Sequence, residues 1–155
     1  MTLLEAITEV KDSMTDIKSF HYADQFEINM LTDKFLESKY PFMLVLPFDV
    51  ADVPRKSGAL HGTVNLDIYF LTKVEAQTQD YVTSDVETEV MTTLRLLARR
   101  FAHKLNEHDI IDPEGEGITQ RTYTPQYGLY DAHTFGIQLT MAVPIAERAT
   151  NICSP

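Results

Sequence analysis

One stretch constrains the fold more than any other, because apolar side chains between residues 84 and 107 recur at steps of three and four. Those side chains are Val86, Val90, Leu94, Leu97, Phe101 and Leu105. This spacing places them on one face of an α-helix, with charged residues in the positions between them. Ser84 and Glu87 have the Ser-x-x-Glu form of a capping box, which predicts the start of the helix. A second layer must therefore cover one side of a long helix.

Four segments predict the strands of that second layer. Residues 42–46 form a continuous apolar run, typical of a central strand that is buried on both faces. Residues 63–70 and 134–143 alternate apolar and polar side chains, typical of strands with one buried face. Residues 118–124 predict a further strand. Pro144 is expected to end the strand at residues 134–143.

The N-terminal region predicts a shorter helix at residues 2–18, because its apolar side chains also fall three and four apart. Residues 20–40 change period midway, which indicates a short extended piece and then a short helix. We therefore expect an α+β fold, α/β in the broad sense, within a single domain of residues 1–155. Its mixed, mainly antiparallel sheet of about four strands packs against the helix at 84–107 and the N-terminal helix.

Charge and cysteine usage exclude several classes of protein. The 13 basic and 23 acidic residues give a formal net charge of −10, which repels nucleic-acid phosphates and anionic lipid. The single cysteine, Cys153, allows neither an intrachain disulfide nor a multi-cysteine zinc site and fits a reducing compartment. The early acid Glu5 argues against a signal peptide, and no apolar run approaches the roughly 20 residues that span a bilayer. These features favour a cytoplasmic protein.

A group of titratable residues at the end of the long helix is the first candidate for chemistry. His103, Glu107, His108, Asp109 and Asp112 offer donor types that divalent metals accept. Helix C-termini favour histidine and the following turn favours aspartate for local reasons, and no HExxH motif completes a site. We therefore predict no metal.

Two further patterns fail as catalytic or cofactor sites. Asp131 and His133 lie two residues apart at the start of a strand, where the aspartate could orient the histidine as a general base. No Gly-x-Ser-x-Gly elbow supplies a nucleophile for them. Residues 58–63 contain two glycines but lack the lysine of a phosphate loop. The sequence therefore predicts no catalytic or cofactor-binding residues, and a protein that is not an enzyme.

Three long connections, at residues 47–61, 73–83 and 125–132, are candidates for binding other proteins. Four tyrosines lie in or beside the connections, where such rings either anchor an interface or cover the chain's own core. They are Tyr81, Tyr123, Tyr127 and Tyr130. The predicted interface residues are Arg55, Lys56, Tyr81, Tyr127 and Tyr130.

Arg95 and Arg99 lie one turn apart in the second half of the long helix. They could dock an acidic surface of a partner. Basic residues in this half also complement the helix dipole, and that interpretation is favoured here.

Three segments carry a resemblance to a known family: Tyr40-Pro-Phe-Met-Leu-Val-Leu46, the helix from Ser84 to Glu107, and Phe135-Gly-Ile-Gln-Leu-Thr-Met-Ala-Val143. The order of these segments, which extends over nearly the whole chain, resembles that of tail terminator proteins of tailed bacteriophages.

The resemblance implies a structural subunit of the virion, made in the host cytoplasm, that forms a ring, usually a hexamer. The ring ends the tail tube, joins it to the head completion (connector) proteins, and lets DNA pass without specific binding. The alternative is a small cytoplasmic α+β enzyme or ligand-binding protein with a pocket formed by His103, His108, Asp131 and His133.

Overall fold

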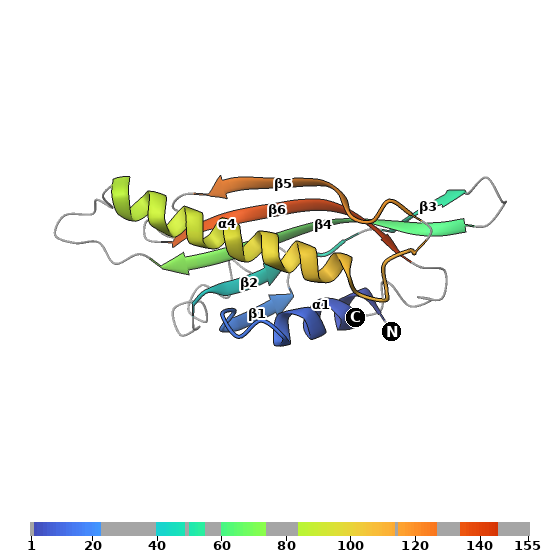
Figure 1. The fold of residues 1–155 in the computed structure, drawn as a ribbon, viewed down its shortest axis with the longest axis horizontal. Helices are drawn as coiled ribbons and strands as arrows, with labels where there is room; N and C mark the ends of the chain where they lie inside the picture. Colours follow the sequence, from blue (N-terminus) through green and yellow to red (C-terminus); the bar gives the residue numbers. More distant parts are fainter. Residues whose placement is uncertain are drawn as a thin grey trace.

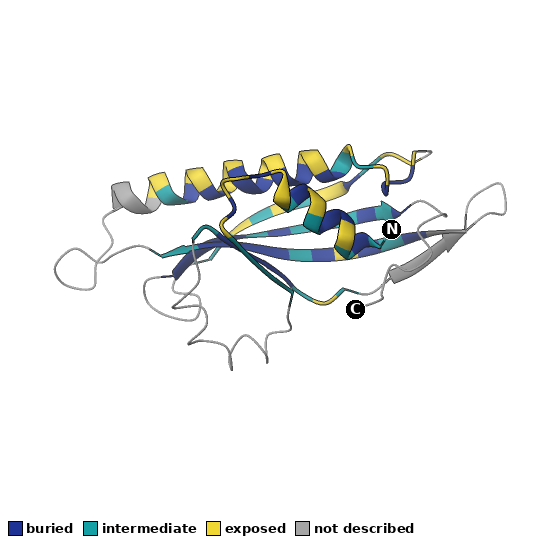
Figure 2. Ribbon diagram, turned by 90° about the horizontal axis from the view of Figure 1, so that it is seen from below, coloured by how far each residue is buried: buried dark blue, intermediate teal, exposed yellow. Residues whose placement is uncertain are grey.

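Both helices of the described chain lie on one side of a sheet (Figures 1 and 2). The computed structural model describes residues 2–22, 40–48, 50–54, 60–73, 84–113, 115–126 and 134–145. Within them the elements follow the order α1 (Leu3–Asp12), β1 (Ser19–Tyr22), β2 (Phe42–Val45), β3 (Val50–Pro54), β4 (Leu60–Lys73), α4 (Ser84–Asn106), β5 (Thr119–Gln126) and β6 (Thr134–Ile145). The predicted α+β class and the long helix are confirmed. The side chains of the predicted Ser84–Glu87 capping box lie outside the described set.

The sheet is built around β4, the longest strand. The strand order is β1-β2-β4-β6-β5, and β3 also pairs with β4. Strand β6 pairs antiparallel with β4 from Gly62 to Lys73, while β2 and then β3 follow its other edge. The pair β1–β2 is parallel and all other pairs are antiparallel, so the sheet is mixed and mainly antiparallel as predicted. The predicted first strand, β2, is buried throughout and lies between β1 and β4.

The main core lies between the sheet and the helices. Alternate residues of β4 and β6 face it together with the buried stripe of α4, and Figure 2 shows that stripe turned toward the sheet. The rings of Phe70 and Phe101 meet with centroids 5.7 Å apart. The packing members predicted from the sequence share this core: Leu94, Leu97 and Phe101 with Leu66, Ile68, Ile137 and Leu139. A second buried cluster lies on the far face of the sheet: Phe42, Leu44, Tyr69 and Leu71.

Helix α1 ends earlier than the predicted residue 18. It stops at Asp12, and the C-cap Ser13 donates its backbone N–H to the Glu9 carbonyl. Two tight turns follow, closed by the N–H groups of Met14 and Ile17, and both of these side chains stay buried. Turns that close every three residues repeat the apolar spacing of a helix, so the sequence pattern could not separate the two.

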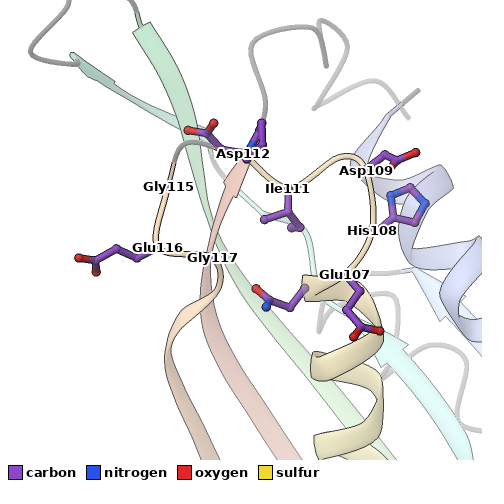
Figure 3. Close-up of a pocket in the computed structure, with 10 residues that line it drawn as sticks. Glu107, His108, Asp109, Ile111, Asp112, Gly115, Glu116 and Gly117 are labelled. Carbon is purple, nitrogen blue, oxygen red and sulfur yellow. The ribbon is translucent and has the colours of Figure 1, made fainter.

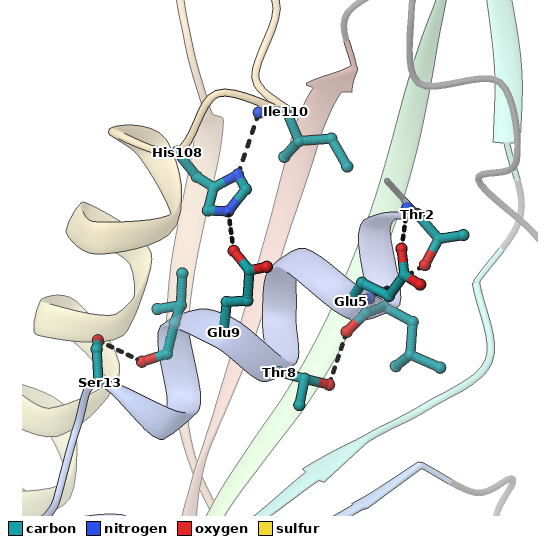
Figure 4. A network of polar contacts seen from close by, with 9 residues as sticks. Thr2, Glu5, Thr8, Glu9, Ser13, His108 and Ile110 are labelled. Carbon is teal, nitrogen blue, oxygen red and sulfur yellow. Dashed lines mark hydrogen bonds and ion pairs between the residues drawn. The ribbon is translucent and has the colours of Figure 1, made fainter.

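The start of α1 is fixed by an N-cap. Thr2 accepts the Glu5 backbone N–H through its hydroxyl at 3.1 Å, and the Glu5 carboxylate accepts the Thr2 N–H at 2.7 Å (Figure 4). This reciprocal pair is a capping box. Past the helix, Asp16 forms an ion pair with Arg100 of α4 and so connects the two helices.

These contacts predict acid sensitivity. The Thr2 backbone hydrogen bond lowers the pKa of Glu5, and hydrogen bonding to Arg100 lowers the pKa of Asp16. A lowered folded-state pKa contributes stability that is complete above the ordinary carboxyl values of about 4 and is lost as pH falls through the lowered values. We expect Asp16→Asn to reduce stability at neutral pH and to flatten its decline in acid, measured by denaturant titration at several pH values. An unchanged acid slope would contradict this assignment.

The predicted loop at residues 47–61 is wrong in part, because it contains a strand. Residues Val50–Pro54 form β3 and pair antiparallel with β4, which already begins at Leu60. Turn-forming residue types dominated the local composition, so the five residues that pair with the nearby start of β4 were not recognised as a strand. With β1 and β3, both short, the described sheet has six strands rather than about four.

The end of β6 also differs from expectation, since Pro144 lies inside the strand. Pro144 pairs with Thr63 of β4, and its carbonyl accepts the Asp112 N–H at 3.0 Å on the other side. A residue's N–H and C=O point to the same side of a strand, so the N–H that proline lacks would face the Asp112 side. Strand β5 pairs only as far as Ala142, so no ladder bond is lost.

The structure also bears on two other predicted segments, residues 125–132 and residues 20–40. Strand β5 continues through Gln126, so the predicted loop at 125–132 begins later. The expected extended piece near Phe20 is confirmed as β1, and the short helix expected before residue 40 lies outside the described residues.

Candidate functional site

A hollow of about 420 Å³ lies at the C-terminal end of α4 (Figure 3). It is lined by the end of the helix and the turn that leads to β5: Asn106, Glu107, His108, Asp109, Ile111, Asp112, Pro113, Gly115, Glu116 and Gly117. Four of these residues are acidic. Asp112 is buried, whereas Glu107, Asp109 and Glu116 are exposed. The hollow therefore gives this end of the molecule a concentrated negative charge.

His108 has a structural role in this turn. The Ile110 backbone N–H donates to its Nδ1 at 3.1 Å, and its Nε2 lies 3.0 Å from a Glu9 carboxylate oxygen (Figure 4). Because Nδ1 accepts, Nε2 carries the proton and donates to Glu9. Both ring nitrogens are thus engaged, and His108 ties α1 to the turn after α4.

Asn106 and Gly117 close the other side of the hollow. The Asn106 side-chain oxygen accepts the Ile118 N–H at 2.7 Å. Gly117 has a φ of +80°, and a Cβ there would lie 2.6 Å from that oxygen. Only glycine fits this conformation and this close approach without strain. The Asn106 side chain and Gly117 therefore fix the course of the chain just before Ile118.

The predicted metal-type group is not brought together. His103 points to solvent and lies 3.4 Å from Glu107, while His108 contacts Glu9 instead. Within the described ranges, no three His, Cys, Asp or Glu side chains are placed to hold a metal ion. Asp131 and His133, the predicted orienter and base, lie outside the described residues.

The five predicted interface residues, Arg55, Lys56, Tyr81, Tyr127 and Tyr130, also lie outside the described residues. Of the four tyrosines considered, Tyr123 is described. Its side chain packs against the main core from β5, so for this ring the core-covering interpretation is the correct one.

The outer face of α4 is a candidate site that the sequence pattern underrated. Leu96 is 54% exposed, the one large exposed apolar side chain of the described residues. Arg95, Arg99 and Arg100 are exposed around it. The signal was present in the sequence, because Leu96 falls outside the apolar steps that contain its neighbour Leu97. We call Arg95, Leu96, Arg99 and Arg100 the basic helix face.

The helix dipole contributes little at Arg95 and Arg99. The dipole acts within about the last turn of a helix. The basic side chains in the last turn of α4 are His103 and Lys104, whereas Arg95 and Arg99 lie two to three turns before its end at Asn106.

A row of polar side chains crosses the far face of the sheet. Asp67 of β4 accepts hydrogen bonds from Thr140 at 2.7 Å and from Gln138 at 3.2 Å, both on β6. Gln138 in turn accepts one from Gln126 of β5 at 3.1 Å. The row joins three strands beside the apolar cluster of the same face.

The row should matter for stability. In an Asp67→Ala variant, Gln138 and Thr140 lose their shared acceptor in partly buried positions, so we expect a loss of about 1–3 kcal/mol in the free energy of unfolding. Asn65→Ala is the matched control, because Asn65 is exposed two residues earlier on the same face of β4. Equal costs in urea titrations of the two variants would show that the row adds nothing.

Comparisons with known proteins add no family. No protein-family model matches the chain, and no curated protein matches it significantly. Neither described helix is both long and apolar enough to cross a membrane.

Proposed function

We propose that the chain is a structural subunit of the neck or tail of a tailed bacteriophage. In this role it assembles, as a hexamer, into a ring that terminates the tail tube and joins it to the head completion proteins, in the virion and, during assembly, in the host cytoplasm. It performs no chemistry and acts through its surfaces.

The order of the elements carries this proposal. An N-terminal helix, an apolar strand, a central amphipathic strand, a long helix and a closing strand pair are the features on which the family resemblance rests. The main groups that could support the enzyme alternative are used otherwise or lie outside the described residues, since His108 contacts Glu9 and Ile110. One fold can serve many functions, so the test of this proposal is a functional one.

Neighbouring reading frames and the tail tube provide that test. We expect the genes beside this one to encode tube, sheath or head completion proteins. When the tube protein is purified as tubes and mixed with this chain, electron microscopy should show a ring at one tube end. Tubes that stay bare at both ends, next to a chain that stays monomeric at high concentration, would overturn the proposal.

Weak affinity for DNA is a further expected result. A net charge of −10 on each subunit repels phosphates close to the channel wall, within the screening length of about 8 Å at physiological salt. We expect no binding to duplex DNA tighter than about 10⁻⁶ M at about 150 mM salt in a fluorescence anisotropy titration. Tighter binding that disappears in an Arg95→Glu/Arg99→Glu variant would instead make the basic helix face a nucleic-acid site.

A further inference from the structure

Leu96, within the basic helix face, lies opposite the buried stripe of α4, and Arg95 and Arg99 lie to one side of it. Leu96 precedes Arg99 by three residues and Arg100 by four, so these side chains share one surface of the helix. From Val90 to Asn106 the helix has no acidic residue. A leucine that is 54% exposed among arginines therefore forms an apolar centre with a positive rim. Arginine is among the residue types that are enriched at protein interfaces.

Contacts among the residues that the structure describes do not account for this face. Arg100 pairs with Asp16, whereas Arg95 and Arg99 form no ion pair with the residues that the structure describes. The helix dipole contributes little at their positions. Within the described part of the chain, the two arginines are therefore exposed without an acidic partner.

A second copy of this chain is the partner that charge favours. The chain carries 23 acidic and 13 basic residues, and four of the basic ones lie between Arg95 and Lys104. The rest of its surface is therefore strongly acidic. A second copy is also present wherever the first one is, at the same concentration.

The described acidic side chains differ in whether they form contacts with other described residues. Those of α1 and the turn after it serve internal contacts: Glu5 with Thr2, Glu9 with His108, Asp12 with Lys11 and Asp16 with Arg100. Asp109 and Glu116 are exposed and form no ion pair within the described part of the chain. Figure 3 shows them pointing to opposite sides of the turn that borders the hollow. We call Asp109, Glu116 and the hollow the acidic turn.

We propose that the basic helix face of one copy docks on the acidic turn of a second copy. Leu96 enters the hollow, whose lining includes Ile111 and Pro113 and whose 420 Å³ exceeds the volume of a leucine side chain. Arg95 and Arg99, beside Leu96, meet Asp109 and Glu116, the acids that border the hollow. The contact joins two different surfaces, so copies add head to tail and close into a ring where the rotation permits.

This inference deepens the proposed ring and rests on it for its biological setting, but its test needs no tail tube. The mass of the full-length chain is measured by light scattering over a range of concentrations, at low and at high salt. We expect concentration-dependent association that weakens with salt, since exposed charges are screened. Two variants reverse the charges, Arg95→Glu/Arg99→Glu on the helix and Asp109→Lys/Glu116→Lys on the turn. Each should weaken association by on the order of tenfold or more.

The combined four-position variant is the decisive chain, because it exchanges the signs of both surfaces and should restore association. Lys11→Glu/Lys18→Glu is the control, with the same change in net charge on a different surface. Circular dichroism verifies that each chain is folded, and Leu96→Asp provides an independent disruption. A wild-type chain that stays monomeric at its solubility limit would overturn the contact. So would association unaffected by Arg95→Glu/Arg99→Glu and Leu96→Asp, or a combined variant that fails to recover. The tube-end experiment decides the proposed function separately.

Discussion

Replacing Leu97 with alanine should lower the free energy of unfolding by roughly 2–5 kcal/mol, through lost burial and the cavity left behind. Leu97 is 3% exposed and belongs to the core between α4 and the sheet, together with Phe101, Ile68 and Leu139. The surrounding side chains come from several elements, so they cannot all move in to fill the space.

The neighbouring residue provides a matched control. Leu96→Ala makes the same chemical change one position earlier on the same helix, where the side chain is 54% exposed. Surface substitutions of this kind usually change stability by less than about 0.5 kcal/mol. Urea titrations of both variants measure the difference. A cost below about 1 kcal/mol for Leu97→Ala would mean that this face of α4 is not in the core.

Gly136→Ala should cause the second large loss, about 1–3 kcal/mol, by overpacking. A Cβ at this position would lie 2.9 Å from the Phe70 carbonyl oxygen and 2.5 Å from Leu71 Cδ2. The leucine can rotate, but the carbonyl belongs to the backbone of β4, where Gly136 pairs with Leu71. The two central strands would therefore have to separate locally.

Gly115→Ala is the control for this prediction. A Cβ at Gly115 would meet Asp112 atoms at 3.6 Å, an ordinary contact. Thermal unfolding followed by circular dichroism should show a lower melting temperature for Gly136→Ala and little change for Gly115→Ala. Similar melting temperatures for both variants would show that β4 and β6 tolerate the extra methyl group.

The parts of the fold that the sequence predicted are those whose pattern is set by one large buried face. Helix α4 and strands β4 and β6 each place a long row of side chains against the same core, so the period of the element appears directly in the residue order. The short strands β1 and β3 have four and five residues, too few to establish a period. Their pairing depends on β2 and β4, which no local pattern reveals.

The candidate site was predictable in its residue types but not in its arrangement. His103, Glu107 and His108 are close in sequence, yet the chain turns after Asn106 and directs His108 toward Glu9 of α1. That contact joins residues 99 positions apart in the sequence. The exposed position of Leu96, in contrast, follows from the helical period alone and was available from the sequence.

The position of β6 determines when the domain can form during synthesis. This last described strand lies between β4 and β5, both of which precede it in the chain, and pairs with β4 over twelve positions. Until residues 134–145 have left the ribosome, β4 and β5 have no strand between them, and the sheet-side half of the core is open. The sheet must therefore wait for residues 134–145, as expected for non-local strand pairing. A chain truncated before Thr134 would lose the middle of its sheet rather than an edge, and would expose the apolar stripe of α4 to aggregation.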